Sequence, residues 1–165
     1  MKNEQGFSLI ELLIVVAIIA IIAAIAIPSM LTAREAANES AGMEACRTIG
    51  SAEIAYASTN NQQYGQIADL YGGNFVDSRF AASGAVVGGY TYTDNVTITD
   101  PTSSQVVGGT APALFGINAA HIAGMARWDF QIGADEVVRY GTTAPNGIKA
   151  SSPIGATAAG GGGGS

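Results

Sequence analysis

Cationic side chains are scarce in this chain of 165 residues, which carries seven lysines and arginines against 13 aspartates and glutamates and a net charge of −6. Proteins that bind nucleic acid neutralise phosphates with clustered Lys and Arg, so the shortage argues against nucleic-acid binding by the single subunit. Cysteine is nearly absent too: Cys46 stands alone, which excludes an intramolecular disulfide. Because Cys46 lies in an alanine-rich helical pattern, we expect a small buried residue there rather than a reactive thiol or an intersubunit bridge.

Groups that carry catalytic chemistry are also rare. His121 is the only histidine, and neither a cysteine nor a tight cluster of acids lies near it in the sequence, so a structural or surface role is expected. No GxGxxG motif opens a helix after a strand, and three glycine pairs are better explained as loop or turn elements, at 72–73, 88–89 and 108–109. The sequence therefore predicts a protein that is not an enzyme, with no catalytic residue and no cofactor.

Signals for a metal or a glycan are weak. Asp94, Asp100 and nearby carbonyls could hold calcium loosely, but their spacing matches no EF-hand loop, so no metal site is predicted. The triplet Asn95-Val96-Thr97 fits the glycosylation sequon, although such triplets often arise by chance.

What the chain has in excess is hydrocarbon near its start. Sixteen apolar residues stand in a row over 12–27, and the longer segment 7–27 has only Ser8 and Glu11 as polar positions. A spanning helix needs about 20 apolar residues, so this segment predicts a retained membrane helix. A secretory signal peptide cut after Ala26 is the alternative, but the run is longer than the usual signal core and contains an acid.

Glu11 is the one charge inside this segment. A lone carboxylate in a membrane helix is costly and usually faces a partner. No Lys or Arg lies within helical reach of Glu11 on its own segment. A cut before Phe7 would create an α-amino group one helical turn from the carboxylate. The two groups could then pair within one chain, or Glu11 could meet the amine of a neighbouring copy.

The string GFSLIELLIVVAIIAIIAAIAIP, residues 6–28, closely resembles the amino-terminal signature of type IV pilins and the related pseudopilins. The resemblance implies a leader peptide at 1–6 and cleavage between Gly6 and Phe7. It also implies that the prepilin peptidase that makes this cut methylates the new amine of Phe7.

The same resemblance assigns assembly roles within the hydrophobic helix, 7–28. It implies that Glu11 pairs with the terminal amine of a neighbouring subunit as the filament forms, and that Pro28 marks the point where the helix kinks or melts. Proline removes a backbone donor, so a kink at Pro28 is also expected on physical grounds. The implied partners are membrane lipid before assembly, further copies of the chain in a helical homopolymer, and the pilus assembly platform with its motors.

Beyond Pro28 the helical pattern resumes and predicts an amphipathic half of the same helix over 29–60, ending near Asn60-Asn61. One apolar stripe is expected along it, formed by Ala33, Ala37, Ala41, Ala45, Ile49, Ala52 and Tyr56. The charged residues lie mostly off that stripe: Arg34, Glu35, Glu39, Glu44, Arg47 and Glu53. The whole helix would be a rod of roughly 80 Å, which neither water alone nor a membrane alone can satisfy.

Residues 61–150 predict a globular head, followed by a flexible Gly-rich tail at 151–165. The expected elements of the head are a helical turn at 66–70, strands within 86–99, a short strand or irregular loop at 112–117, and a hairpin of 125–133 and 136–141 joined by Ala134-Asp135. The predicted fold class is α+β, with the long amino-terminal helix packed on a small three- or four-stranded antiparallel sheet.

Together these features predict a structural subunit, the pilin of a type IV pilus. It would be stored in the bacterial inner membrane and then join an extracellular filament on the cell surface. A pseudopilin of a type II secretion system is the alternative within the same class. We favour the pilus, because the sequence has no calcium-loop pattern like that of the major secretion pseudopilins. A membrane-tethered enzyme or binding domain is the alternative from another class, and it would need a pocket with converging titratable groups.

Overall fold

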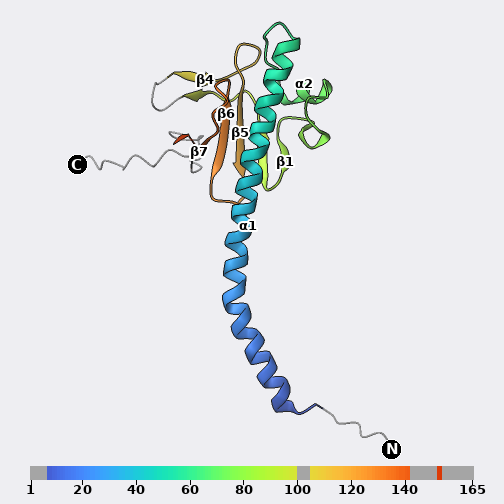
Figure 1. Ribbon diagram of the computed structural model, residues 1–165, viewed down its shortest axis with the longest axis vertical. Helices are drawn as coiled ribbons and strands as arrows, with labels where there is room; N and C mark the ends of the chain where they lie inside the picture. The colour runs from blue at the N-terminus through green and yellow to red at the C-terminus, as the bar shows by residue number, and fades with distance from the viewer. Residues whose placement is uncertain (1–6, 100–104, 142–151, 154–165) are drawn as a thin grey trace, which may run out of the picture.

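The computed structural model describes residues 7–99, 105–141 and 152–153, and its main feature is one long helix that carries a small head around its second half (Figure 1). This helix, α1, spans Leu9–Thr59. The other elements are α2 (Ile67–Gly72), the 3-10 turn η1 (Ser78–Phe80) and the strands β1 (Ala85–Val87), β2 (Tyr90–Thr93), β3 (Ile98–Thr99), β4 (Val106–Gly108), β5 (Gly116–His121), β6 (Asp129–Gly133), β7 (Arg139–Gly141) and β8 (Ser152–Pro153). The predicted α+β class is confirmed.

The carboxyl end of α1 lies where the sequence places it. Asn60 is the C-cap, and the N–H of Gln62 donates to the carbonyl of Ala57 at 2.9 Å. Asn61 and Gln62 have positive φ values of 55° and 60°, in the left-handed region that stops a helix. The chain therefore turns back at this point towards the sheet.

Pro28 lies inside α1 without ending it. Figure 1 shows a gentle curve through the lower part of the helix, which stays continuous. The hydroxyl of Thr32 donates to the carbonyl of Ser29 at 3.0 Å and so adds a local hydrogen bond just after the proline. In the single chain the expected kink is thus a curvature. Melting at Pro28 in a filament stays a prediction.

The main sheet has six strands in the order β1-β2-β5-β6-β7-β8, and every neighbouring pair is antiparallel. Three or four strands were expected, and the difference comes from short or weakly signalled strands. β5 has the sequence GINAAH, with Ile117 as its one β-branched residue, and it begins only at the end of the expected segment 112–117. β8 adds two residues within the expected tail, which is otherwise outside the described residues, as is the expected leader at 1–6.

The two expected turns are present. Gly88 and Gly89 join β1 to β2 with φ values of 60° and 84°, which fits a two-residue hairpin turn that needs positive φ at both positions. The hairpin of β6 and β7 pairs Phe130 with Tyr140 across the strands. A separate pair, β3 and β4, packs against β5 and β6. Glycine is required at that contact, because a Cβ on Gly116 would collide with the carbonyl oxygen of Val96.

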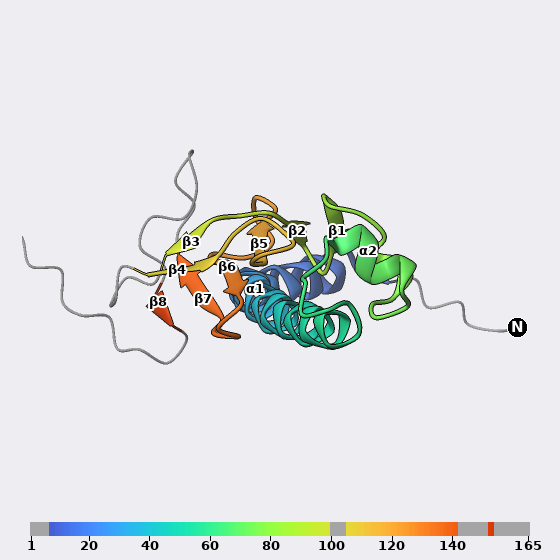
Figure 2. The ribbon, with the colours of Figure 1, turned by 90° about the horizontal axis from the view of Figure 1, so that it is seen from above.

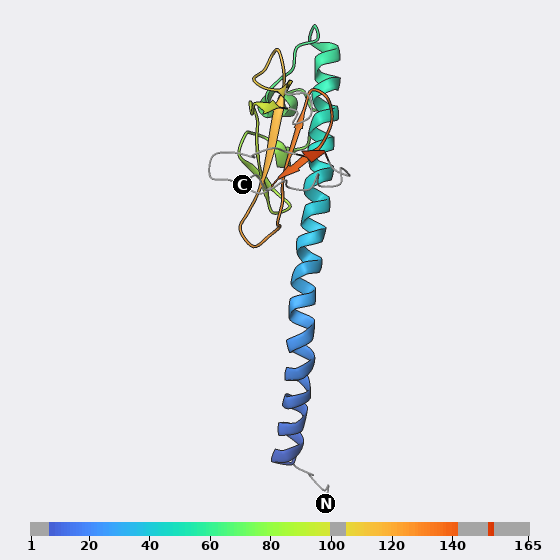
Figure 3. The same cartoon turned by 90° about the vertical axis from the view of Figure 1, so that its left-hand side faces the viewer.

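The core lies between α1 and one face of the main sheet (Figures 2 and 3), with α2 on the side of β1. Its buried apolar residues are Cys46, Ile49, Ala52, Ile67, Leu70, Val76, Phe80, Tyr90, Tyr92, Phe115, Ile117, Ala119, Ala126, Phe130, Ile132 and Val138. The prediction that Cys46 is a small buried residue is therefore confirmed.

The predicted stripe on α1 is only partly right. Ala33, Ala37 and Ala41 are exposed, while the residues that face the sheet are Glu39, Gly42, Cys46, Ile49, Gly50, Ala52, Glu53 and Ala57. The expectation that Glu39 and Glu53 lie off the buried face was wrong. The sheet approaches α1 over its glycines, where missing side chains leave room. Each of the two buried carboxylates accepts a backbone N–H, Glu39 from Arg127 and Glu53 from Gly65.

Candidate functional site

Residues 7–37, which comprise Phe7, Ser8 and the first part of α1, project beyond the head and are called the stalk below (Figure 1). No residue of the stalk is buried. Its large apolar side chains are 47–83% exposed, and they are Phe7, Leu9, Ile10, Leu12, Leu13, Ile14, Val15, Val16, Ile18, Ile19, Ile21, Ile22, Ile25, Ile27, Met30 and Leu31. Burying such side chains is worth roughly 1.5–3 kcal/mol each, so the stalk requires an apolar environment that this chain does not itself provide.

The composition of the stalk indicates what that environment is. An 18-residue window of α1 has a mean hydropathy of 3.2, and none of it is buried, so this helix is long and apolar enough to cross a membrane. Apolar side chains surround the helix on all sides, as in a spanning segment, whereas a helix on the surface of a soluble domain has one apolar stripe.

Glu11 has a hydrogen-bond donor within its own chain, which is a backbone N–H and not a cationic side chain. One carboxylate oxygen, Oε2, accepts the backbone N–H of Ser8 at 2.9 Å, at the amino-terminal end of α1. The first N–H groups of a helix have no helical acceptor, and a carboxylate there is also favoured by the helix dipole. The spacing Ser-x-x-Glu before an apolar run is a capping signature, so this bond could have been predicted from Ser8 and Glu11.

The residues assigned to processing and assembly lie at the two ends of the apolar surface. Phe7 is 83% exposed at the tip of the stalk, next to Ser8 and one helical turn from Glu11. Gly6 lies outside the described residues, so cleavage after it stays a prediction. Pro28 lies near the other end, about three helical turns before Asn38, and is separate from the Phe7–Glu11 end.

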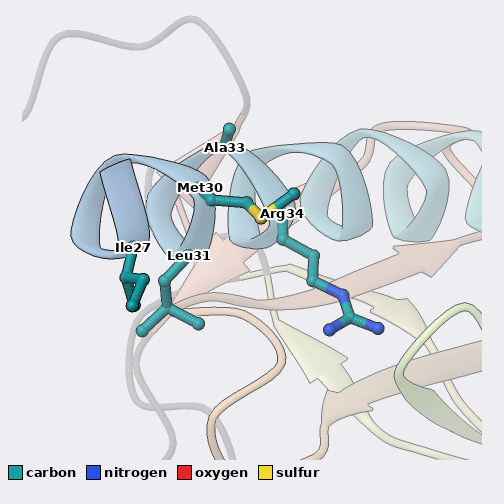
Figure 4. A pocket seen from close by; sticks show the side chains of 5 residues that line it. All are labelled: Ile27, Met30, Leu31, Ala33 and Arg34. Atoms are coloured by element: carbon teal, nitrogen blue, oxygen red, sulfur yellow. The ribbon is translucent and has the colours of Figure 1, made fainter. Parts of the chain in front are cut away.

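A shallow hollow lies on the stalk around Pro28, lined by Ile27, Met30, Leu31, Ala33 and Arg34. Figure 4 shows Ile27, Leu31 and Arg34 on one side of α1. Arg34 is the first charged residue after Glu11, so the uncharged part of the helix is bounded by a carboxylate at one end and a guanidinium at the other. This arrangement suits a segment with polar surroundings at both ends and an apolar one between them.

The head begins where α1 first makes polar contacts with the sheet. The side-chain amide of Asn38 donates to the carbonyl of Met125 at 2.7 Å. Glu39 accepts the backbone N–H of Arg127 at 3.1 Å and pairs with its guanidinium at 3.2 Å. These two neighbouring residues fix the β5–β6 loop to the helix just above the stalk.

Farther along α1, Glu53 ties the helix to the loop that follows it. Its Oε2 accepts the N–H of Gly65 at 3.0 Å, while Oε1 has no partner among the described residues. Burial raises the pKa of the Glu53 carboxyl to about 7, the Gly65 hydrogen bond opposes this shift, and the nearby Asp94 and Asp69 add to it. Glu53 is therefore partly protonated near neutral pH.

His121 has an acidic partner that its sequence neighbourhood does not reveal. Its Nδ1 lies 2.6 Å from Oδ1 of Asp129, and the same oxygen accepts the His121 backbone N–H at 2.7 Å. β5 and β6 form a hairpin, so the strands bring these two residues together from eight positions apart in sequence. The imidazole helps to satisfy a buried carboxylate, which agrees with a structural role for His121.

The remaining candidate groups are engaged in local structure. Asp94 Oδ2 accepts the N–H of Ile67 at 3.0 Å, and Asp100 lies outside the described residues. Within the described ranges, no group of three or more His, Cys, Asp and Glu side chains could hold a metal ion. The exposed Asn95, whose sequon was a weak signal in the sequence, accepts the N–H of Ala111 at 3.2 Å through Oδ1. Burial raises the pKa of the Cys46 thiol to about 12, so it is protonated at neutral pH.

The hollows of the head contain isolated charges. One hollow between α1, η1 and the β1–β2 turn has Glu44 and Arg79 as its charged residues, and Arg79 already pairs with Asp77 at 2.6 Å. Another, beside β6 and β7, combines Glu39 with aromatic side chains. In the described part of the head, these hollows do not bring titratable groups together in the way that a tethered enzyme requires.

Comparison with known proteins gives a match over the amino-terminal part of the chain, which includes most of the stalk. Residues 1–27 match the model of the prokaryotic N-terminal methylation motif, the prepilin signature of type IV pilins and pseudopilins. The motif implies processing by a prepilin peptidase, and together with the apolar helix it fits an inner-membrane precursor. Searches of curated proteins and of solved structures returned no match.

Proposed function

We propose that this chain is a structural, non-enzymatic subunit of a type IV pilus. It is stored in the inner membrane, cut between Gly6 and Phe7, methylated on the new amine of Phe7, and assembled through its stalk into an extracellular filament. One observation carries the proposal: an apolar helix with no buried residue over 7–37 starts in the N-terminal methylation motif.

The same apolar surface serves both states in this proposal. Before assembly, lipid chains cover the stalk, and afterwards the stalks of neighbouring subunits cover it. Transfer from lipid to protein gives little hydrophobic gain, so close packing over small residues and charge pairing must contribute the selectivity. The run AIIAIIAAIA over 17–26 supplies five small residues, Ala17, Ala20, Ala23, Ala24 and Ala26.

Glu11 links processing to assembly. Its hydrogen bond to Ser8 holds the carboxylate at the amino-terminal end of α1, next to the bond that the peptidase would hydrolyse. Hydrolysis leaves a carboxylate on Gly6 and an amine on Phe7. The amine of a neighbouring subunit can then pair with Glu11, so both charges are neutralised only when subunits meet in order.

A pseudopilin of a type II secretion system would share this stalk and the same motif, since both kinds of subunit carry the prepilin signature. The sequence lacks the calcium-loop pattern of the major secretion pseudopilins, which is why the pilus is preferred.

Mass spectrometry of the mature amino terminus tests the processing step. The proposal expects a chain that starts at N-methylated Phe7. A mature chain that starts at Ile27 would instead identify a secretory signal peptide and end the proposal.

Substitution of Glu11 by Ala tests the assembly step. We expect E11A protein to accumulate in the membrane at normal levels, while filaments sheared from the cell surface are nearly abolished. Glu44 is a matched control, because its side chain is 73% exposed on the head half of the same helix, and E44A should form filaments normally. Wild-type filament yield from E11A would disprove the pairing with the neighbour's amine.

A further inference from the structure

The connection between β5 and β6, residues 122–128, forms the base of the head. In both side views this loop, drawn in orange, reaches farther along α1 towards the stalk than any other described part of the head (Figures 1 and 3). Its two large aliphatic side chains are partly exposed, Ile122 by 38% and Met125 by 41%. The base of the head therefore carries partly exposed apolar side chains.

This loop is held rigidly on the helix. Its tight turn is closed by a hydrogen bond from the N–H of Met125 to the carbonyl of Ile122 at 2.9 Å, and the N–H of Ile122 donates to Gly89 at 2.9 Å. Asn38 binds the Met125 carbonyl from α1. Ile122 and Met125 thus keep a fixed height above the stalk.

The helix face below the loop is apolar at Ile27 and Leu31 and becomes polar at Arg34 and Asn38, next to the loop. Ile27, Leu31, Arg34 and Asn38 follow one another at four- and three-residue steps, so they share one face of α1. Asn38 is the residue that binds the loop, and Figure 4 shows the other three on one side of the helix. The loop therefore lies on the same side of α1 as Ile27 and Leu31, and Arg34 lies between them and the loop.

The charges on the stalk set the level of a bilayer. Glu11 and Arg34 are 23 residues apart, which is about 35 Å of helix, slightly more than the ~30 Å of a hydrocarbon core. Arg34 then lies among the headgroups, where a guanidinium can reach phosphate while its stem stays in the apolar layer. Asn38 is only about 6 Å farther along, so the loop bound to it lies at the headgroup level as well.

We propose that the β5–β6 loop, with Ile122 and Met125, is a phospholipid-contact surface that seats the head on the bilayer in the membrane-stored state. This inference rests on the proposed membrane storage of the subunit. The occupant is the phospholipid headgroup layer, because the loop lies just beyond the apolar part of the stalk, at the level of Arg34, and itself carries Arg127, which pairs with Glu39 and whose side chain is 63% exposed. Extraction of the subunit into a filament must then break this contact as well as withdraw the stalk.

Site-specific fluorescence in vesicles tests the contact. The full chain carries M125C labelled with an environment-sensitive maleimide dye, and Cys46 does not compete because it is buried and protonated. The vesicles contain phosphatidylcholine and phosphatidylglycerol with a fraction of lipid that bears a nitroxide on its headgroup. Two matched variants complete the set: S58C, exposed at the far end of α1, and A20C, in the middle of the apolar run.

The proposal expects headgroup nitroxides to quench the M125C label at least about twofold more than the S58C label, at every protein-to-lipid ratio. Equal quenching at the two positions, while nitroxides on the acyl chains quench the A20C label, would overturn the contact and leave membrane storage intact. A difference seen only at high protein density would overturn it in favour of a second copy of the chain. An A20C label that acyl-chain nitroxides do not quench would overturn both proposals.

Discussion

The two parts of α1 belong to one uninterrupted helix but differ in what surrounds them: one is exposed and the other packs against the head. The stalk, 7–37, is mostly apolar, has no charge between Glu11 and Arg34 and is exposed, whereas the part within the head, 38–59, contains two glycines and several charges and is the one that packs. In the head, glycines let the sheet approach and each buried carboxylate has a local donor. The comparison shows that hydrophobicity does not report which part of a helix forms the core of its own chain. The most apolar stretch is the one that its own chain leaves exposed.

An identical change in the two parts should separate them most clearly. I49A removes a fully buried side chain that packs against the sheet, and we expect it to lower the free energy of unfolding of the head by about 2–5 kcal/mol. I22A removes a side chain that is 60% exposed and should change that free energy by less than about 0.5 kcal/mol. Thermal or denaturant unfolding of both variants in mild detergent measures the difference. Equal losses would mean that the stalk belongs to the folded core.

Glu53 offers a pH-dependent test of the head alone. Its folded pKa of about 7 lies above the usual 4.5, so the folded head holds this proton more tightly than the unfolded chain does. The stabilisation is complete below about pH 4.5 and is lost as the pH rises through 7. E53Q keeps an acceptor for Gly65 but cannot ionise. We therefore expect it to raise the free energy of unfolding by about 2 kcal/mol at pH 8 and to change it little at pH 4.

Unfolding curves of wild type and E53Q between pH 4 and pH 8 check this expectation. E44Q, at an exposed position of the same helix, is the control and should follow the wild type throughout. A wild-type head that gains stability from pH 5 to pH 8, with E53Q showing the same slope, would contradict the role given to Glu53.

The glycines on the buried face of α1 should differ in their tolerance of a methyl group. A Cβ on Gly42 would lie 2.7 Å from Cε2 of Tyr90, a buried ring held by a hydrogen bond to Trp128, so G42A should cost about 1–2 kcal/mol. A Cβ on Gly50 would meet mainly the terminal methyl of Ile132, which can move, and the higher helix propensity of Ala offsets the strain. We expect G50A to be close to neutral, and equal losses in denaturant unfolding would refute the distinction.

The smallest effect is expected at the ion pair between Glu39 and Arg127. Its arginine side chain is 63% exposed, so R127A should cost no more than about 1 kcal/mol, and the loss should shrink at high salt. R47A removes a fully surface-exposed pair with Glu44 and should have no measurable effect. Denaturant unfolding of the two variants at low and high salt compares their losses of stability. A larger loss for R47A than for R127A would contradict the expectation.

Much of the fold could be predicted because its strongest signals are local. The apolar run, the end of α1 near Asn60 and the glycine turn at 88–89 each depend on a few adjacent residues. The rotational phase of the buried face on α1 could not be predicted, since Ala41 and Gly42 look equally small until the position of Tyr90 is known. Most of β5 was missed because Ile117 is the only strand-forming side chain in GINAAH, and the strand is held by its neighbours on both sides.

The candidate site divides in the same way. Phe7 and Glu11 were identified from the motif, and the Ser8–Glu11 hydrogen bond could have been predicted from its Ser-x-x-Glu spacing. The pairing of His121 with Asp129 could not, because it depends on which residues of two strands face each other. Sequence patterns thus contain the signal for a contact within one helical turn, although the Ser8–Glu11 bond was not predicted, and carry none for contacts created by sheet register.

Because α1 is continuous through Pro28, it also fixes the rotation of the head about the helix axis relative to the stalk. No break in the helix separates the stalk from the head, so adding or removing one helical residue between them would rotate the head by about 100° about the helix axis. Inserting one alanine between the stalk and Asn38 would preserve every contact within the head and every side chain of the stalk. It would nevertheless turn the β5–β6 loop to a different side of the stalk, away from the face of Ile27 and Leu31. The number of helical residues between Leu31 and Asn38 therefore determines which side of the stalk the β5–β6 loop lies on.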